Sequence, residues 1–277
     1  MSRLFHFILS HSIFISFCAA ALSLQTLLLL SVNPGAVLLS FIFFATLSGY
    51  NAYWIISRFS FNTYISAGAF LGKIKSSLVV IFVALAGMLY CMGHLHLVMY
   101  NVVITFALLS MYALPLLPIR WLHFTRKAGF VKTLLLALAW TMVTTLIPLQ
   151  VVVTDMNRAE VLLFINRFLF MLMLCIIFDK RDAAMDKIRG LQSLATDIRP
   201  TVLNYLIAGI TVAYILVSIL LGKEGVNGLQ VASLLAMALI TPFVYILSIK
   251  KRGYVFYYFL VDGLMFLSGL LTLLASI

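Results

Sequence analysis

The chain has 277 residues, of which 64% are hydrophobic and only 10% are charged, and its mean hydropathy is +1.14. Soluble globular proteins are about 25% charged, so this composition excludes a soluble enzyme or binding domain and indicates a membrane protein with several spans. The net charge of +11 comes without a soluble basic domain. We therefore attribute it to orientation in the bilayer and expect no nucleic-acid partner.

Nine apolar segments follow one another along the chain, separated by polar or Gly/Pro-containing stretches. Each is about as long as the roughly 20 residues that a spanning helix needs. They lie near residues 11–32, 36–57, 75–93, 96–116, 131–153, 159–178, 201–222, 227–249 and 254–275. The sequence therefore predicts an all-α polytopic membrane protein in which residues 1–277 form a single domain of nine transmembrane helices.

The basic residues are distributed unevenly between the two sides of the predicted bundle. If the N-terminus is cytoplasmic, all but three of the 19 Lys and Arg residues fall on that side, the exceptions being Arg158, Arg167 and Lys223. Cytoplasmic loops carry an excess of Lys and Arg, so we expect a cytoplasmic N-terminus in a bacterial inner membrane. The three long polar connections, about 58–74, 117–130 and 179–200, are on the same side, where functional residues are expected.

Aromatic residues mark the start of the ninth segment. Tyr254, Tyr257 and Tyr258 follow the basic residues at 250–252. Tyrosines are enriched at the membrane surface, so we expect this group to anchor the last helix there.

Three carboxylates lie close together after the sixth segment. Asp179, Asp182 and Asp186 form the pattern DxxDxxxD and are three of only eight acidic residues in the chain. This spacing places them along one stripe of a helix, where they repel one another unless a cation lies between them. Mg²⁺ is held by such carboxylates together with a substrate phosphate. The alternative is a solvated helix end, neutralised by the interleaved basic residues Lys180, Arg181, Lys187 and Arg189.

With Gly190, Ser193 and Leu194, the acidic stretch reads DxxDxxxDxxxGxxSL. In this it resembles the second Asp motif of the UbiA superfamily of intramembrane prenyltransferases, and the segment from Tyr112 to Trp140 is similar to the family's stretch between helices 4 and 5. The resemblance implies nine helices around a central cavity. It also implies an isoprenyl diphosphate held by Mg²⁺ between two Asp motifs, with its tail in an apolar chamber open to lipid. An acceptor would attack the allylic carbocation left when the diphosphate departs.

The family's first motif, NDxxDxxxD, is missing. Aligned on Asn51, its Asp positions hold Ala52, Ile55 and Phe59, and no acid occurs before residue 154. With one triad we expect at most one Mg²⁺ site, which leaves excess negative charge on a departing diphosphate. Residues that could bind that charge directly are Asn51, Arg58, Lys73, Lys75, Arg120, Arg126, Lys127, Lys187 and Arg189.

We expect the protein to bind an isoprenyl diphosphate or a lipid. Two functions remain open. One is a prenyltransferase with an impaired or non-standard metal site. The other is a catalytically inactive homologue that binds an isoprenoid or lipid, or has a structural role. A transporter should show paired charges through the bilayer centre, and the sequence offers little of that beyond Arg167 and Asp262.

Arg167 and Asp262 lie about halfway along the sixth and ninth segments. A lone charge at that depth costs about 2.5–3.5 kcal/mol on insertion scales, so each needs a partner or a polar cavity. We predict that the two form an ion pair. The alternative is that one of them reaches a polar cavity separately.

Overall fold

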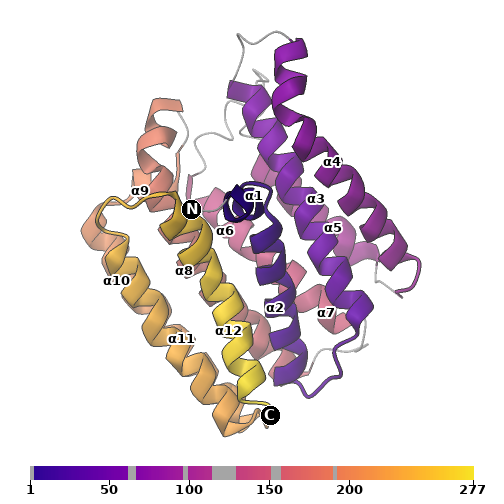
Figure 1. The fold of residues 1–277 in the computed structure, drawn as a ribbon. Coiled ribbons are helices and arrows are strands. Elements are labelled where there is room, and N and C mark those ends of the chain that lie inside the picture. Colours follow the sequence, from indigo (N-terminus) through magenta and orange to yellow (C-terminus); the bar gives the residue numbers. More distant parts are fainter. Residues whose placement is uncertain (1–2, 62–66, 96–98, 114–128, 151–156, 190–191) are drawn as a thin grey trace.

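The computed structural model describes residues 3–61, 67–95, 99–113, 129–150, 157–189 and 192–277. Every regular element in these ranges is a helix (Figure 1). In chain order they are α1 (Arg3–Ser10), α2 (Ile13–Leu29), α3 (Ala36–Phe61), α4 (Ala67–Met92), α5 (Met99–Ala113), α6 (Gly129–Thr141), the π-helical turn η3 (Met142–Leu146), α7 (Ile147–Gln150), α8 (Arg158–Arg189), α9 (Leu194–Asp197), α10 (Pro200–Lys223), α11 (Gly228–Leu247), the π-helical turn η4 (Phe256–Val261) and α12 (Asp262–Leu274). The predicted all-helical, multi-pass membrane protein is confirmed.

The number of spans agrees only approximately with the predicted nine. Seven helical segments in the described residues are long and apolar enough to cross a membrane, and the bent pair α1 and α2 adds an eighth if it forms one span. The apolar helix α5 has 15 residues. The bend of 62° between α1 and α2 was not predicted. Ser12 lies at this bend with a left-handed backbone, φ 62°, a conformation uncommon outside glycine.

Stretches expected as loops are largely helical where they are described. α3 continues to Phe61 and α4 begins at Ala67, so helix covers most of the expected loop 58–74. Likewise α8 extends to Arg189 and is followed by α9, in place of the expected loop 179–200. Alanine, methionine, lysine and arginine are frequent in 180–189, and their high helix propensity explains the extension. Of the expected loop 117–130, residues 117–128 lie outside the described residues, and 129–130 begin α6.

The long helix α8 occupies the interior of the bundle. It packs against α6 and α10, while α2 packs against α3 and α12 (Figure 1). All residues from Phe170 to Ile177 are buried. A helix that is apolar on every side is expected in the interior, and this run has no polar face. The acidic stretch therefore begins where a buried helix reaches the end of the bundle.

A layer of buried polar side chains connects α8, α2 and α12. Arg167 is 3% exposed. Its Nη1 donates to Gln25 Oε1 at 2.8 Å, and its Nη2 donates to Thr26 Oγ1 at 3.2 Å and to a backbone carbonyl of α2 at 3.1 Å. Gln25 Nε2 then donates to Oγ of Ser268 at 2.9 Å and to Oγ1 of Thr272 at 2.7 Å. We call these five residues the polar layer.

The predicted ion pair between Arg167 and Asp262 is wrong, since neither the salt bridges nor the hydrogen bonds of the described residues join the two side chains. The polar layer lies at Ser268 and Thr272 of α12, whereas Asp262 is the first residue of that helix. At 1.5 Å per residue, Asp262 lies roughly 9–15 Å further along the helix axis. The two charges are therefore at different depths, and neutral groups accept the hydrogen bonds of Arg167 Nη1 and Nη2.

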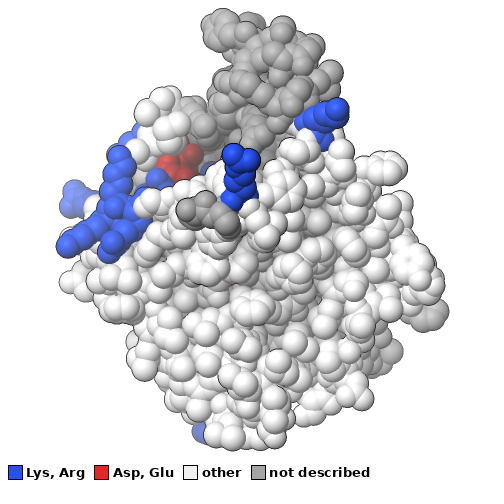
Figure 2. All heavy atoms as spheres, in the orientation of Figure 1, with Lys and Arg blue, Asp and Glu red and all other residues white. Residues whose placement is uncertain are grey.

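Charged side chains gather at one end of the molecule. Figure 2 shows Lys and Arg grouped beside the visible acidic atoms at the end where α1 and α9 lie, while most of the rest of that face is uncharged. We call this the charged end. It agrees with the expected asymmetry of basic residues, and its cytoplasmic orientation stays a prediction.

Candidate functional site

The three carboxylates of the acidic motif lie in the last turns of α8 at the charged end. Asp179 and Asp182 are partly buried, and Asp186 is 5% exposed. They belong to one continuous helix, as the spacing predicted. The motif is thus a stripe of acids that begins directly after the buried run of α8.

Each acid faces a group supplied by the chain itself. Thr133 Oγ1 on α6 donates a hydrogen bond to Asp179 Oδ2. Lys132 Nζ, also on α6, lies 3.8 Å from Asp186 Oδ2. Adjacent residues of α6 therefore reach two carboxylates seven positions apart on α8, and the motif fastens these two helices together.

Arg181 contacts Asp182 through two of its nitrogens. Its Nε and Nη2 donate to the two carboxylate oxygens of Asp182 at 2.7 and 2.8 Å, in the bidentate geometry that suits guanidinium and carboxylate. The guanidinium carbon lies 4.8, 5.3 and 4.9 Å from the ring centres of Phe178, Tyr257 and Tyr258. Its buried Nη1 has no hydrogen-bond partner within the described residues. Arg181 is held by rings and a carboxylate and keeps one donor that an anion could use.

Two further cations at the acidic motif, Lys132 of α6 and Lys180 of α8, also lie over rings. Lys132 Nζ is 5.7 Å from the ring centre of Tyr112, and Lys180 Nζ is 4.6 Å from that of Tyr245. Cation–π attraction favours such positions where water is partly excluded. The side chain of Lys132 is only 15% exposed. The charge of Lys132 is thus fixed close to the acids.

The arrangement does not fit a held Mg²⁺ as it stands. No group of three or more His, Cys, Asp or Glu side chains that could hold a metal ion occurs among the described residues. Asp182 and Asp186 face Arg181 and Lys132, so a metal ion would have to displace both cations. The single Mg²⁺ site expected at Asp179, Asp182 and Asp186 stays a prediction, and no chemical step is derived through it.

Asn51, where the family's first motif would begin, has a structural contact. Its side chain is 1% exposed, and its Nδ2 donates to the backbone oxygens of His11 and Leu47, both at 2.8 Å. It therefore ties α3 to the bend between α1 and α2. Ala52 and Ile55 beside it are partly buried and offer no polar atom in their side chains.

The structure brings few of the other expected diphosphate-binding residues to the motif. Lys75 on α4 and Lys187 on α8 are exposed, and no contact joins Lys75 to the acids within the described residues. The remaining expected residues have side chains outside the described part of the chain: Arg58, Lys73, Arg120, Arg126, Lys127 and Arg189. Lys132 and Thr133, which the structure does bring to the motif, were not expected there. In the sequence, both residues stand at the start of the fifth segment and within the stretch from Tyr112 to Trp140 that resembles the family.

Two solved structures share this fold over nearly the whole chain. A digeranylgeranylglyceryl phosphate synthase matches 100% of this chain and 98% of its own, with a TM-score of 0.57 and 15% identity. A UbiA homologue from Aeropyrum pernix matches 96% of this chain and 97% of its own, with a TM-score of 0.62 and 13% identity. No family model and no curated protein sequence matches the chain. The comparisons confirm the UbiA-like fold that the motif indicated.

Proposed function

We propose that the chain is a prenyltransferase-type membrane protein that binds an isoprenyl diphosphate. Its diphosphate would lie at the charged end and its prenyl tail among the apolar helices. The full-length fold likeness supports this proposal, because one of the similar proteins is a digeranylgeranylglyceryl phosphate synthase. The retained acidic motif at the end of α8 supports the position of the headgroup.

The observation that carries the proposal is the set of cations held at the motif. A diphosphate carries roughly three negative charges, and Arg and Lys are the side chains that bind phosphate oxygens. Arg181 has an unpartnered Nη1, and Lys132 lies 3.8 Å from its carboxylate, longer than a close hydrogen bond. In this proposal, Lys132 and Arg181 contact phosphate oxygens once the headgroup displaces the side chains that bury Arg181 Nη1, while Asp182 and Asp186 keep both cations in place.

In this proposal, the acids position cations of the chain, and these cations replace part of the charge that a second metal site would supply. Transfer breaks the allylic C–O bond, the diphosphate leaves with the bonding electrons, and an acceptor nucleophile bonds to the carbon and loses its proton. Lys132 and Arg181 would stabilise the negative charge that grows on the leaving group.

A second candidate is an inactive homologue that binds the isoprenyl diphosphate without turnover. The specific observation in its favour is that the carboxylates already have partners, while Ala52 and Ile55 replace the acids of the opposite motif. The two candidates share the binding step and differ in the release of diphosphate.

Binding of geranyl diphosphate to the purified protein in detergent tests the shared step. We expect binding that persists in EDTA and weakens about tenfold or more in Arg181→Gln, because a hydrogen bond to a charged group is lost. Lys75→Gln removes the same charge from an exposed position on α4 and should bind like the wild type.

Equal binding by Arg181→Gln and Lys75→Gln would contradict the cation clamp, and complete loss of binding in EDTA would show a metal-held headgroup. Release of diphosphate in the presence of acceptors extracted from membranes then separates the candidates. Release favours the transferase, and binding without release favours the inactive homologue.

A further inference from the structure

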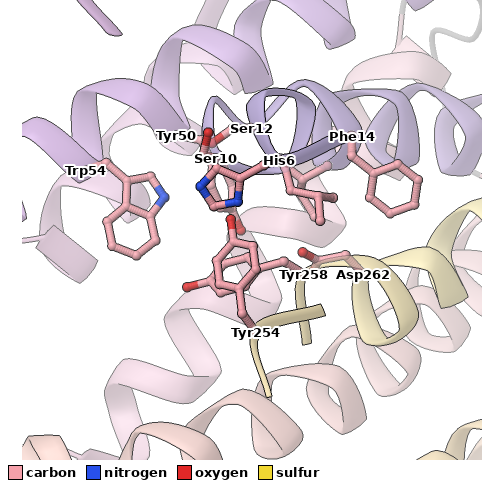
Figure 3. Close-up of a pocket in the computed structure, with 11 residues that line it drawn as sticks. His6, Ser10, Ser12, Phe14, Tyr50, Trp54, Tyr254, Tyr258 and Asp262 are labelled. Carbon is pink, nitrogen blue, oxygen red and sulfur yellow. The ribbon is translucent and has the colours of Figure 1, made fainter. Parts of the chain in front are cut away.

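A cavity of about 290 Å³ lies at the charged end, between α1, the start of α2, α3 and the start of the last helix (Figure 3). Its wall contains the aromatic side chains of Tyr50, Trp54, Tyr254 and Tyr258, together with the imidazole of His6. Asp262 is the only Asp or Glu among the residues that line it. The cavity therefore combines rings with a single carboxylate.

The rings form a connected wall. The ring centres of Tyr254 and Tyr258 are 4.3 Å apart, those of His6 and Tyr254 are 5.9 Å apart, and those of Trp54 and Tyr258 are 6.4 Å apart. They come from α1, α3 and the segment that leads into α12. Figure 3 shows them grouped around one space. Aromatic rings attract cations that lie over their faces.

Asp262 lies at the inner side of this space. It is 6% exposed, and it makes no hydrogen bond or ion pair with any described residue. Figure 3 shows its carboxylate directed toward Tyr258 and the open space. Arg181 is near enough to act on it electrostatically, but two of the nitrogens of that guanidinium are bonded to Asp182. A buried carboxylate without a partner is costly, so a cation in the cavity would stabilise it.

We propose that this cavity binds an organic ammonium ion of about the size of choline. Rings and one carboxylate are the groups that recognise such a cation, since the rings attract its diffuse charge and the carboxylate neutralises it. One carboxylate in a wall of rings supplies few of the roughly six to eight oxygen ligands that Ca²⁺ takes, and Mg²⁺ sites usually combine their carboxylates with substrate phosphate oxygens. An anion is repelled by Asp262. The cavity shares the ring of Tyr258 with Arg181 of the acidic motif, but none of the motif's own described residues lines it, and the proposal does not rest on isoprenyl diphosphate binding.

Calorimetry with choline, on the protein in detergent, tests the charge requirement. We expect choline to bind, and we expect its neutral isostere, in which carbon replaces the quaternary nitrogen, to bind at least about tenfold more weakly. Asp262→Asn should lower choline affinity by about tenfold or more, and Trp54→Leu should lower it several-fold. Glu224→Gln is the control, because it removes the same charge from a residue that is paired with Arg158 and does not line the cavity. This variant should bind choline with unchanged affinity.

Asp262→Asn removes an unpartnered buried charge, so its melting temperature should equal or exceed that of the wild type, and weak binding cannot then be attributed to misfolding. The ammonium group could come from a free molecule or from a lipid headgroup. Vesicles of phosphatidylglycerol, with and without phosphatidylcholine, separate the two. If the natural occupant is a lipid headgroup, the apparent affinity for choline falls only in the vesicles that contain phosphatidylcholine. If it is a free molecule, the affinity for choline is the same in both kinds of vesicle. Absence of choline binding, or equal binding of the isostere, would overturn the proposal.

Discussion

Replacing Gln25 with leucine is expected to destabilise the protein strongly. The substitution removes the Oε1 that accepts from Arg167 at 2.8 Å and the Nε2 that donates to Ser268 and Thr272. A hydrogen bond to a charged group contributes about 1.5–3 kcal/mol, and a buried guanidinium left short of partners adds to the loss. Arg167 Nε already has no partner among the described residues, so losing Gln25 leaves two of the three guanidinium nitrogens without a hydrogen bond from the polar layer. We expect the melting temperature in detergent to fall by about 5 °C or more.

Gln230→Leu is the matched control for this prediction. Gln230 is also buried, and its Nε2 donates to Leu28 O at 3.1 Å and Ser276 Oγ at 2.8 Å, but it does not contact Arg167. Hydrogen bonds between neutral groups in membrane proteins contribute about 0.6 kcal/mol on average, so its effect should be small. If the two variants melt at the same temperature, the polar layer does not depend on the charge of Arg167.

Gly269→Ala is expected to have an effect of similar size through steric crowding. A Cβ at Gly269 would lie 2.5 Å from the carbonyl oxygen of Ala21, which is backbone and cannot turn aside. α12 would have to move away from α2, its main neighbour, and overpacking of this kind costs about 1–3 kcal/mol. Small residues allow this close approach of helices in membranes. A thermal melt of the purified protein measures the loss.

Gly263→Ala makes the same change on the same helix at a position with room. A Cβ there would meet the ring of Phe14 at 3.6 Å, an ordinary contact. Because alanine favours helix over glycine by up to about 1 kcal/mol, this variant should be as stable as the wild type or slightly more so. If the Gly269→Ala variant has the same melting temperature as the Gly263→Ala variant, α2 and α12 have space between them at this position.

Hydropathy was enough to predict an all-helical membrane protein, but it missed the bend between α1 and α2 and the continuation of α8 to Arg189. Charge spacing was enough to predict that Asp179, Asp182 and Asp186 share a helix. Their partners could not be read in the same way. Lys132 and Thr133 reach the motif because α6 packs beside α8, and that contact depends on the three-dimensional order of helices.

The error at Arg167 has a related cause. The rule that a buried charge needs a partner was correct, but the partner is the neutral Gln25, 142 residues away in sequence. Asp262 was predicted as the partner because it carries the opposite charge and lies about halfway along its segment. A sequence gives the depth of a residue in the membrane only roughly, so the difference in depth was missed. Asp262 lines the cavity of aromatic side chains at the charged end, and the alternative that one of the two charges reaches a polar cavity separately stays a prediction.

The absence of acidic residues before Asp155 also affects the order in which the charged end can assemble. A chain is made from its N-terminus, so α6 enters the membrane before α8 has been synthesised. Until then the carboxylate with which Lys132 pairs, that of Asp186, is absent. The ion pair between Lys132 and Asp186 can therefore form only after Asp186, 54 residues later in the sequence, has been made.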